Sequence, residues 1–304
     1  MTIAMSKPVL RHTQRLTAAL LLGLTALTTQ AQPPAPVPVV IPDAVKMARP
    51  TPAEVDKAKA SLAAFLANAD ADTKKIVAAY PDLIEVHPPG RNTAIQPDLR
   101  IGFLPKHQNN VKVAEAGDID LLFMGDSITD FWRNPEGNYA GKPVMDKVWP
   151  NVKIANFGIA GDTTQGVLYR LRDGEGKGFS PKAIMLMIGT NNTATNSAGE
   201  IAEGVGGVVT ELQKDFPNAK ILLLGIFPRA TPDSPLRTTI ANINKVIAKL
   251  DDQKKVFYLD IGKVFLDANG VIGKDIMSDG LHPTTKGYEL WANAVKDPLA
   301  KLMK

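Results

Sequence analysis

Residues 119–132 read IDLLFMGDSITDFW, and they join a buried strand to a polar turn. Five of the first six residues, Ile119 and 121–124, are apolar, which predicts a strand buried on both faces. The strand runs directly into a cluster of small and polar residues, Gly125, Asp126, Ser127 and Thr129. Ligand sites of open parallel sheets lie beyond the carboxyl ends of the strands, so this cluster marks a candidate site.

The same pattern of apolar runs recurs along the rest of the chain. Further runs lie at 152–157, 183–188, 221–226 and 256–259, and helical patterns near 165–173, 200–216, 237–250 and 284–302 alternate with them. Strands that are apolar throughout and separated by helices are typical of a parallel sheet covered on both faces. The last helix carries the stripe expected of a sheet-facing helix, namely Leu290, Trp291, Ala294, Val295, Leu299 and Leu302. The sequence therefore predicts a three-layer α/β domain with five parallel strands.

The first 31 residues have the composition of a secretory signal peptide. Three basic residues, Lys7, Arg11 and Arg15, precede the apolar run 16–27, and small residues precede a cleavage site near Ala31. A retained transmembrane helix fits less well, because a span needs roughly 20 apolar residues. We therefore expect an exported protein, periplasmic or secreted, with no stable membrane insertion.

Between the predicted signal and the α/β domain lie two further segments. Residues 32–51 are rich in proline and predict an extended linker. Residues 52–100 contain helical patterns at 52–68 and 73–79, followed by recurring prolines. We interpret them as a small helical appendage that packs against the α/β domain of residues 101–304, and a docking or lid role is the alternative. No feature of the sequence indicates an oligomeric state.

Charge and cysteine content exclude several classes of protein. The chain has 304 residues and a formal net charge of +4, which falls to +1 once the three basic residues of the predicted signal are removed. This balance predicts no surface for nucleic acid. The chain contains no cysteine, which excludes disulfides, cysteine nucleophiles and thiolate metal sites.

Polar clusters follow the other strands at the same predicted edge of the sheet. Their sequences are GIAGDTT at 158–164, GTNN at 189–192, Pro-Arg at 228–229 and SDGLHP at 278–283. His282 is the only histidine that follows a core strand at this edge, since His12 lies in the predicted signal and His87 and His107 precede the first strand.

These residues are the parts of an acyl-transfer site. A serine hydroxyl becomes a nucleophile when an imidazole takes its proton, and a carboxylate orients the imidazole; Ser127, His282 and Asp279 fit these roles. The oxyanion of such a reaction needs fixed donors. The candidates are the backbone N–H groups of Ser127 and Gly161 and the side-chain amide of Asn191.

Each cluster has a simpler interpretation when taken alone. A Gly-Asp-Ser turn often caps a helix, 158–164 resembles a phosphate loop without its lysine, and 191–193 is formally a glycosylation acceptor. His282 could be a core histidine and Asp279 a helix cap. The glycine-rich stretch 174–178 predicts a flexible loop rather than a nucleotide site, because it follows a helix. The placement of all the clusters at one edge favours the acyl-transfer site.

The four clusters occur in the order found in the SGNH or GDSL hydrolases, and the chain resembles this family over roughly residues 101–304. GDSIT resembles the serine block, GIAGDTT the glycine block, GTNN the asparagine block and SDGLHP the block with aspartate and histidine. The resemblance implies a flavodoxin-like, doubly wound sheet with Ser127 as nucleophile, Asp279 and His282 completing the triad, and Gly161 and Asn191 as oxyanion donors. It also implies ester hydrolysis without a metal or organic cofactor.

Within the family, the sequences GIAGDTTQGVLYRL and ILLLGIFPRA resemble the branch that contains platelet-activating factor acetylhydrolase catalytic subunits and exported bacterial acylhydrolases. That branch implies short acyl groups, often acetyl. Export then favours O-acetylated carbohydrate as substrate, with Trp132 or Trp149 offering a stacking face unless both lie in the core. Phe131 and Trp132 could instead form an acyl pocket for a lipid or aryl ester. A non-catalytic carbohydrate-binding module on the same fold is the remaining alternative, and it would not need Asp279 and His282.

Overall fold

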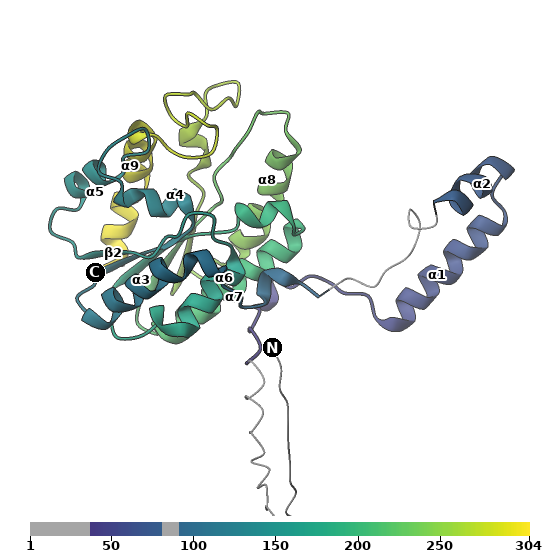
Figure 1. Ribbon diagram of the computed structural model, residues 1–304, viewed down its shortest axis with the longest axis horizontal. Helices are drawn as coiled ribbons and strands as arrows, with labels where there is room; N and C mark the ends of the chain where they lie inside the picture. The colour runs from purple at the N-terminus through teal and green to yellow at the C-terminus, as the bar shows by residue number, and fades with distance from the viewer. Residues whose placement is uncertain (1–36, 81–90) are drawn as a thin grey trace, which may run out of the picture. The chain divides into compact units, whose positions relative to one another are not determined.

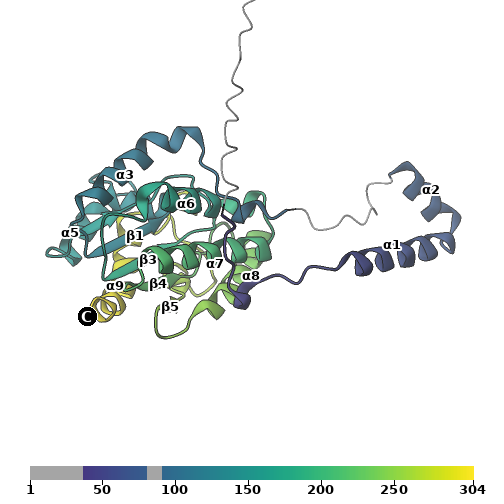
Figure 2. The ribbon, with the colours of Figure 1, turned by 90° about the horizontal axis from the view of Figure 1, so that it is seen from below.

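A parallel sheet lies at the centre of the fold, in a computed structural model that describes residues 37–80 and 91–304. The predicted signal peptide lies outside these residues. The five strands are β1 Leu121–Gly125, β2 Ile154–Asn156, β3 Ala183–Met187, β4 Lys220–Leu224 and β5 Val256–Leu259. Their order is β2-β1-β3-β4-β5 and every pair is parallel. Figure 1 labels β2, and Figure 2 labels the other four strands. The predicted α/β class and the five strands are confirmed.

Helices cover both faces of the sheet, as Figure 2 shows from a second direction. One face packs against α3 Leu104–Ala116, α6 Thr164–Arg170, α7 Ala198–Asp215 and α8 Pro235–Ile247. The other packs against α5 Lys142–Val148 and α9 Thr285–Leu302. The short helix α4 Ser127–Asp130 follows β1, and a π-helical segment, η6 Leu171–Glu175, continues α6. Short 3-10 turns η1, η3, η4, η5, η7, η8 and η9 occupy Asp43–Val45, Thr93–Ile95, Ile101–Phe103, Phe131–Arg133, Asn191–Ala194, Ala248–Leu250 and Gly262–Phe265.

The strand β1 shows why the sheet is apolar on both faces. Leu122 and Met124 belong to the core on the side of α6 and α7, whereas Leu121 and Phe123 belong to the core on the side of α9. All four side chains are fully buried. Alternate residues of a strand point to opposite faces, so a strand buried on both faces loses the polar alternation of a surface strand.

Gly125 ends β1 because no larger residue fits there. It pairs with Met187 of β3, and a Cβ atom at position 125 would lie 2.3 Å from the Met187 carbonyl oxygen and 2.3 Å from Thr129 Oγ1. Either separation is far below van der Waals contact. The glycine therefore lets the first turn of α4, which begins at Ser127, pack closely against the end of the strand.

The proline-rich segment packs onto α7. Residues 39–49 contain no helix or strand other than the 3-10 turn η1, and Val45 is fully buried against the core. Two glycines of α7 provide the room, since a Cβ at Gly206 would lie 2.5 Å from Val45 Cγ2 and one at Gly207 would lie 2.6 Å from Val39 Cγ1. The segment thus contributes to the core in addition to connecting two parts of the chain.

Glu203 of α7 binds residues that precede and follow the next two helices in the sequence. Its carboxylate accepts hydrogen bonds from the Met47 amide at 2.9 Å, from Arg49 at 2.8 and 2.6 Å, and from Asn92 Nδ2 at 2.9 Å. The buried carboxylate is fully paired, which offsets the cost of removing it from water. Met47, Arg49 and Asn92 are therefore held by the same glutamate.

Two helices occupy the stretch between these anchors, namely α1 Pro52–Ala67 and α2 Ala71–Ala79. Thr51 and Glu54 form a reciprocal capping box at the start of α1, and Asp70 caps α2. Neither helix contains a buried residue. Among residues 37–80 and 91–304, no helix is long and apolar enough to cross a membrane.

Candidate active site

Ser127, His282 and Asp279 form a hydrogen-bonded chain beyond the carboxyl end of β1. Ser127 Oγ lies 2.9 Å from His282 Nε2, and His282 Nδ1 lies 2.6 Å from Asp279 Oδ2. Ser127 is buried and the His282 side chain is 18% exposed, so the hydroxyl and the imidazole meet at the boundary of the core. This geometry lets the imidazole accept the serine proton while the carboxylate holds Nδ1–H.

The loop before α9 fixes the Asp279 carboxylate. Its Oδ1 atom accepts hydrogen bonds from the backbone N–H groups of Leu281 at 3.0 Å and His282 at 2.8 Å. Partial burial opposes ionisation of Asp279, but the hydrogen bonds from the His282 ring and from these amides outweigh it and lower its pKa to about 2. The carboxylate is therefore ionised and oriented throughout the neutral range.

The turn after β1 presents Ser127 at the first position of α4. Asp126 caps this helix, its Oδ1 accepting the Ile128 amide at 3.0 Å, while its Oδ2 has no hydrogen-bond partner. Complete burial raises the pKa of Asp126 to about 7. A helix N-terminus carries unpaired N–H groups, and within the described part of the chain the Ser127 amide donates to no other group.

The other two predicted oxyanion donors lie on neighbouring loops. Gly161 has φ +84°, a conformation that favours glycine, and its amide is unpaired within residues 91–304. Asn191 follows β3 and donates one amide hydrogen to the Asp162 carbonyl oxygen at 2.8 Å. Within residues 37–80 and 91–304, its second amide hydrogen has no acceptor. The structure thus links the loop after β3 to the loop that carries Gly161.

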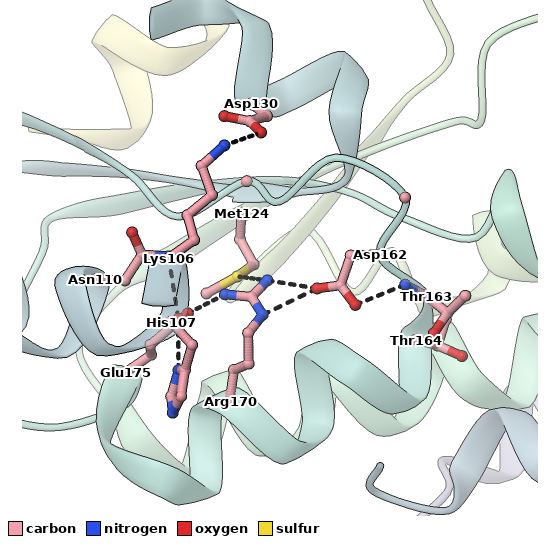
Figure 3. A network of polar contacts seen from close by, with 12 residues as sticks. Lys106, His107, Asn110, Met124, Asp130, Asp162, Thr163, Thr164, Arg170 and Glu175 are labelled. Atoms are coloured by element: carbon pink, nitrogen blue, oxygen red, sulfur yellow. Dashed lines mark hydrogen bonds and ion pairs between the residues drawn. The ribbon is translucent and has the colours of Figure 1, made fainter. Parts of the chain in front are cut away.

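A buried ion-pair network binds Asp162, the residue that follows Gly161 (Figure 3). Arg170 of α6 is completely buried and lies between two carboxylates: it binds Asp162 Oδ2 through Nε at 2.9 Å and through Nη2 at 2.8 Å, and it also binds Glu175. The other Asp162 oxygen accepts the Thr163 amide at 2.8 Å. The residue that follows Gly161 is therefore fixed through both its side chain and its carbonyl group.

Two adjacent residues of α3, Lys106 and His107, contact α4 and the buried ion-pair network, as Figure 3 also shows. Lys106 forms an ion pair with Asp130 of α4, whose Oδ2 accepts the Ala160 amide at 3.0 Å. His107 binds Glu175 through Nδ1 at 2.9 Å and Asp173 through Nε2 at 3.0 Å. Helix α3 thus contacts both the nucleophile helix, through Lys106, and the support of the glycine loop, through His107.

The tryptophans considered for sugar stacking belong to the core. Trp132 is fully buried and Trp149 is 7% exposed; their ring centroids lie 5.9 Å apart, and the Trp132 ring also packs against Trp291 at 5.1 Å. Phe131 is partly exposed instead, with its ring 5.1 Å from that of His282. The core interpretation of the two tryptophans is confirmed, and an acyl pocket that includes Trp132 is contradicted by its burial.

Sequence reasoning missed the residues that support the loop. The stretch 174–178 was expected to be a flexible loop, and this was wrong at Glu175, whose side chain is completely buried with Arg170, His107 and Asn110. Helix α3 was also not predicted, because its buried face carries His107 and Asn110 rather than an apolar stripe. Pro105 in its first turn and Gly117 at its end are the signals that could have indicated it.

The described residues include no group of three or more histidines, aspartates or glutamates placed to hold a metal ion.

The chain matches a known protein family and several known proteins. The model of the GDSL-like lipase/acylhydrolase family matches residues 123–290, which include all five predicted site residues. The platelet-activating factor acetylhydrolase IB subunit alpha2 of Rattus norvegicus is 33% identical over 211 residues, covering 69% of this chain and 88% of that protein. The Homo sapiens protein of the same name is 32% identical with the same coverage.

Solved structures share the fold. A GDSL-like lipase from Bacteroides thetaiotaomicron superimposes with a TM-score of 0.51 at 18% identity, covering 66% of this chain and 97% of that one. A member of the lipolytic G-D-S-L family from Veillonella parvula gives a TM-score of 0.51 at 18% identity, covering 60% and 99%. The family match, the acetylhydrolase relatives and the shared fold together show that the chain belongs to the GDSL-like lipase/acylhydrolase family of esterases.

Proposed function

We propose that the protein is an exported serine esterase that removes short acyl groups, principally acetyl, from carbohydrate through a Ser127–His282–Asp279 triad. The observation that carries the proposal is the continuous hydrogen-bonded chain from Ser127 Oγ to His282 to Asp279. Nucleophile, base and orienting carboxylate are each within hydrogen-bond distance of the next, as a serine hydrolase requires.

The reaction proceeds in two steps. His282 Nε2 takes the Ser127 proton as Oγ attacks the ester carbonyl, and the resulting oxyanion accepts hydrogen bonds from the amides of Ser127 and Gly161 and from Asn191 Nδ2. The intermediate collapses as His282 protonates the departing alcohol, leaving an acyl-serine. His282 then takes a proton from water, the hydroxide oxygen attacks the acyl-serine, and the acid leaves as Ser127 Oγ regains its proton.

A lipid acetyl ester is the second candidate substrate. The relatives are named for platelet-activating factor acetylhydrolase, and they align over 88% of their length. Both candidates share the acetyl group and differ in the alcohol. The predicted signal peptide supports a substrate outside the cytoplasm, which favours the carbohydrate.

The first experiment measures acetate release from O-acetylated xylan and from a 2-acetyl ether phospholipid, beside hydrolysis of p-nitrophenyl acetate and p-nitrophenyl decanoate. Wild type is compared with Ser127→Ala, whose turnover should fall by several orders of magnitude. Serine-dependent acetate release from xylan supports the carbohydrate esterase, and release from the phospholipid alone supports the lipid candidate. Equal activity of Ser127→Ala would overturn the triad, and inactivity toward every ester would favour a binding module.

Export is tested separately. The full chain is expressed in a Gram-negative host and the mature N-terminus is sequenced. A periplasmic or secreted product that starts close to Gln32 supports export, whereas an intact cytoplasmic chain would contradict it.

A further inference from the structure

Two partly exposed aromatic rings stand beside His282 and have no role in the triad. The Phe131 ring centroid lies 5.1 Å from the imidazole and the Tyr139 centroid lies 5.5 Å from it. The two rings stack on each other at 5.7 Å with an interplanar angle of 24°. Trp132, which follows Phe131 in the sequence, is completely buried. Of these two consecutive aromatic residues, only Phe131 therefore reaches the site.

The backbone holds these rings in place before any ligand arrives. The Phe131 carbonyl oxygen accepts hydrogen bonds from the amides of Asn134 at 3.0 Å and Gly141 at 3.2 Å, which closes the loop between the rings. The Asn134 side chain donates to the Tyr139 carbonyl at 3.4 Å. Tyr139 Oη lies 3.3 Å from Ser278 Oγ, next to the triad aspartate. The rings are therefore preorganised, which lowers the entropy lost on binding.

The direction of the reaction decides which part of an ester meets these rings. His282 Nε2 protonates the oxygen of the departing alcohol, so that oxygen lies next to the imidazole, and the alcohol extends over what surrounds it. The carbonyl oxygen of the ester is bound instead by the predicted oxyanion donors, namely the amides of Ser127 and Gly161 and the side chain of Asn191. The Phe131 and Tyr139 rings lie beside the imidazole, and this position assigns them to the alcohol.

We propose that Phe131 and Tyr139 form a leaving-alcohol subsite, and that it accepts a pyranose ring carrying the acyl group. This inference rests on the proposed esterase function and deepens it. A pyranose is rigid and presents an apolar C–H face of about the size of one aromatic ring, and Tyr139 adds a polar tip for hydroxyl groups. A flexible glycerol or alkyl alcohol would lose rotamer freedom on the same small surface and gain less contact.

The test compares two acetyl esters that differ only in the alcohol. Acetate release from acetylated xylo-oligosaccharide and from ethyl acetate is measured for wild type, Phe131→Leu, Tyr139→Leu and Tyr139→Phe. The readout is the ratio of kcat/KM for the oligosaccharide to kcat/KM for ethyl acetate. We expect this ratio to fall about tenfold in each leucine variant, through KM, and to change less than threefold in Tyr139→Phe, which keeps the ring.

The ratio distinguishes a subsite from a mere support of His282. A displaced imidazole lowers both activities by the same factor, so an unchanged ratio in both leucine variants would overturn the subsite. Tyr80→Leu, an exposed aromatic on the described part of the chain before residue 81, is the matched control and should leave the ratio unchanged. Wild-type activity on ethyl acetate with none on the oligosaccharide would overturn the pyranose assignment alone. Inactivity on both would overturn the proposed function itself.

Discussion

The side-chain amide of Asn191 donates a hydrogen bond to the carbonyl oxygen of Asp162 at 2.8 Å. This bond joins the loop after β3 to the residue that follows Gly161, across the point where the strand order reverses between β1 and β3. Ligands of doubly wound sheets bind at such a point. Because one amide hydrogen is fixed in this way, the other has a defined direction, and the two loops that carry predicted oxyanion donors cannot move independently.

Replacement of Asn191 by alanine should therefore lower kcat by about 10²–10³-fold, the usual cost of losing one oxyanion donor. The variant loses both the donor and the bond to Asp162. Asn242→Ala, on the exposed face of α8, is the control and should retain wild-type kcat. Steady-state kinetics with p-nitrophenyl acetate checks this, and a kcat within threefold of wild type for Asn191→Ala would remove Asn191 from the oxyanion hole.

Asp279→Asn should lower kcat by roughly 10⁴-fold with little change in fold, because an amide cannot hold the imidazole in the reactive tautomer. It should also alter the pH dependence of stability. The pKa of Asp279 is about 2 in the folded protein, below its ordinary 3.8, so the carboxylate stabilises the fold above pH 4 and this contribution is lost as the pH falls toward 2. The unfolding free energy, measured with urea between pH 2 and 5, should change less steeply with pH in the variant. The same pH dependence in both proteins would contradict the lowered pKa.

Lys106→Met should reduce kcat about three- to tenfold while leaving the unfolding free energy within about 1 kcal/mol, because a partly exposed ion pair contributes little to stability. The reason for the kinetic effect is that Lys106 binds Asp130, which in turn holds the Ala160 amide of the glycine loop. Lys106→Arg should recover most of the loss. The control is Lys112→Met, an exposed position of the same helix. Full activity in Lys106→Met would show that α3 does not position the loop.

Arg170→Met should destabilise the fold by about 3–5 kcal/mol, because it leaves the carboxylates of Asp162 and Glu175 buried without their cation. Lys182→Met breaks a surface ion pair with Asp120 and should cost less than about 1 kcal/mol. Chemical unfolding at neutral pH measures the loss of unfolding free energy in both variants. Similar losses in the two variants would contradict the structural role of the buried network.

Asp126→Asn should change how stability depends on pH. Burial raises the pKa of Asp126 from 3.8 to about 7, so the folded protein keeps a proton that the unfolded chain releases, and wild-type stability falls as the pH rises from about 4 to about 7. Asparagine keeps the helix cap but does not titrate. The contribution of Asp126 to this slope, up to about 1.4 kcal/mol per pH unit, should be missing in the variant. The unfolding free energies of wild type and variant are measured at pH 4.5, 6 and 8. Equal slopes of free energy against pH in the two proteins would refute the raised pKa.

Much of the fold could be anticipated from local patterns. The run 121–124 is apolar without alternation, and that alone distinguishes a strand of a covered parallel sheet from a surface strand. The stripe of α9 was predicted correctly, with Trp291, Val295 and Leu299 fully buried. These successes share a physical cause, since burial of apolar side chains follows the period of the helix or strand that carries them.

Helix α3 could not be found in that way. Its buried side chains include His107 and Asn110, which are polar, so the helix lacks the apolar stripe on which the prediction depends. The partner of both residues, Glu175, lies more than 60 positions later in the chain. The burial of Glu175 could not be anticipated either, since a glycine-rich stretch with a charged residue is normally exposed.

The sequence by itself determined the class of the sheet, the order of its four polar blocks and the residues available for chemistry, because these follow from local periodicity and from which residue types come directly after each strand. Only the tertiary structure decided that Ser127, His282 and Asp279 form one chain of hydrogen bonds, and that Asn191 binds the glycine loop. It also decided that Glu203 binds both Arg49 and Asn92, and that Phe131 lies beside His282 while Trp132 enters the core. The reason is that a polar or aromatic contact between distant positions leaves no period in the sequence, and its partner is chosen only when packing brings two elements together.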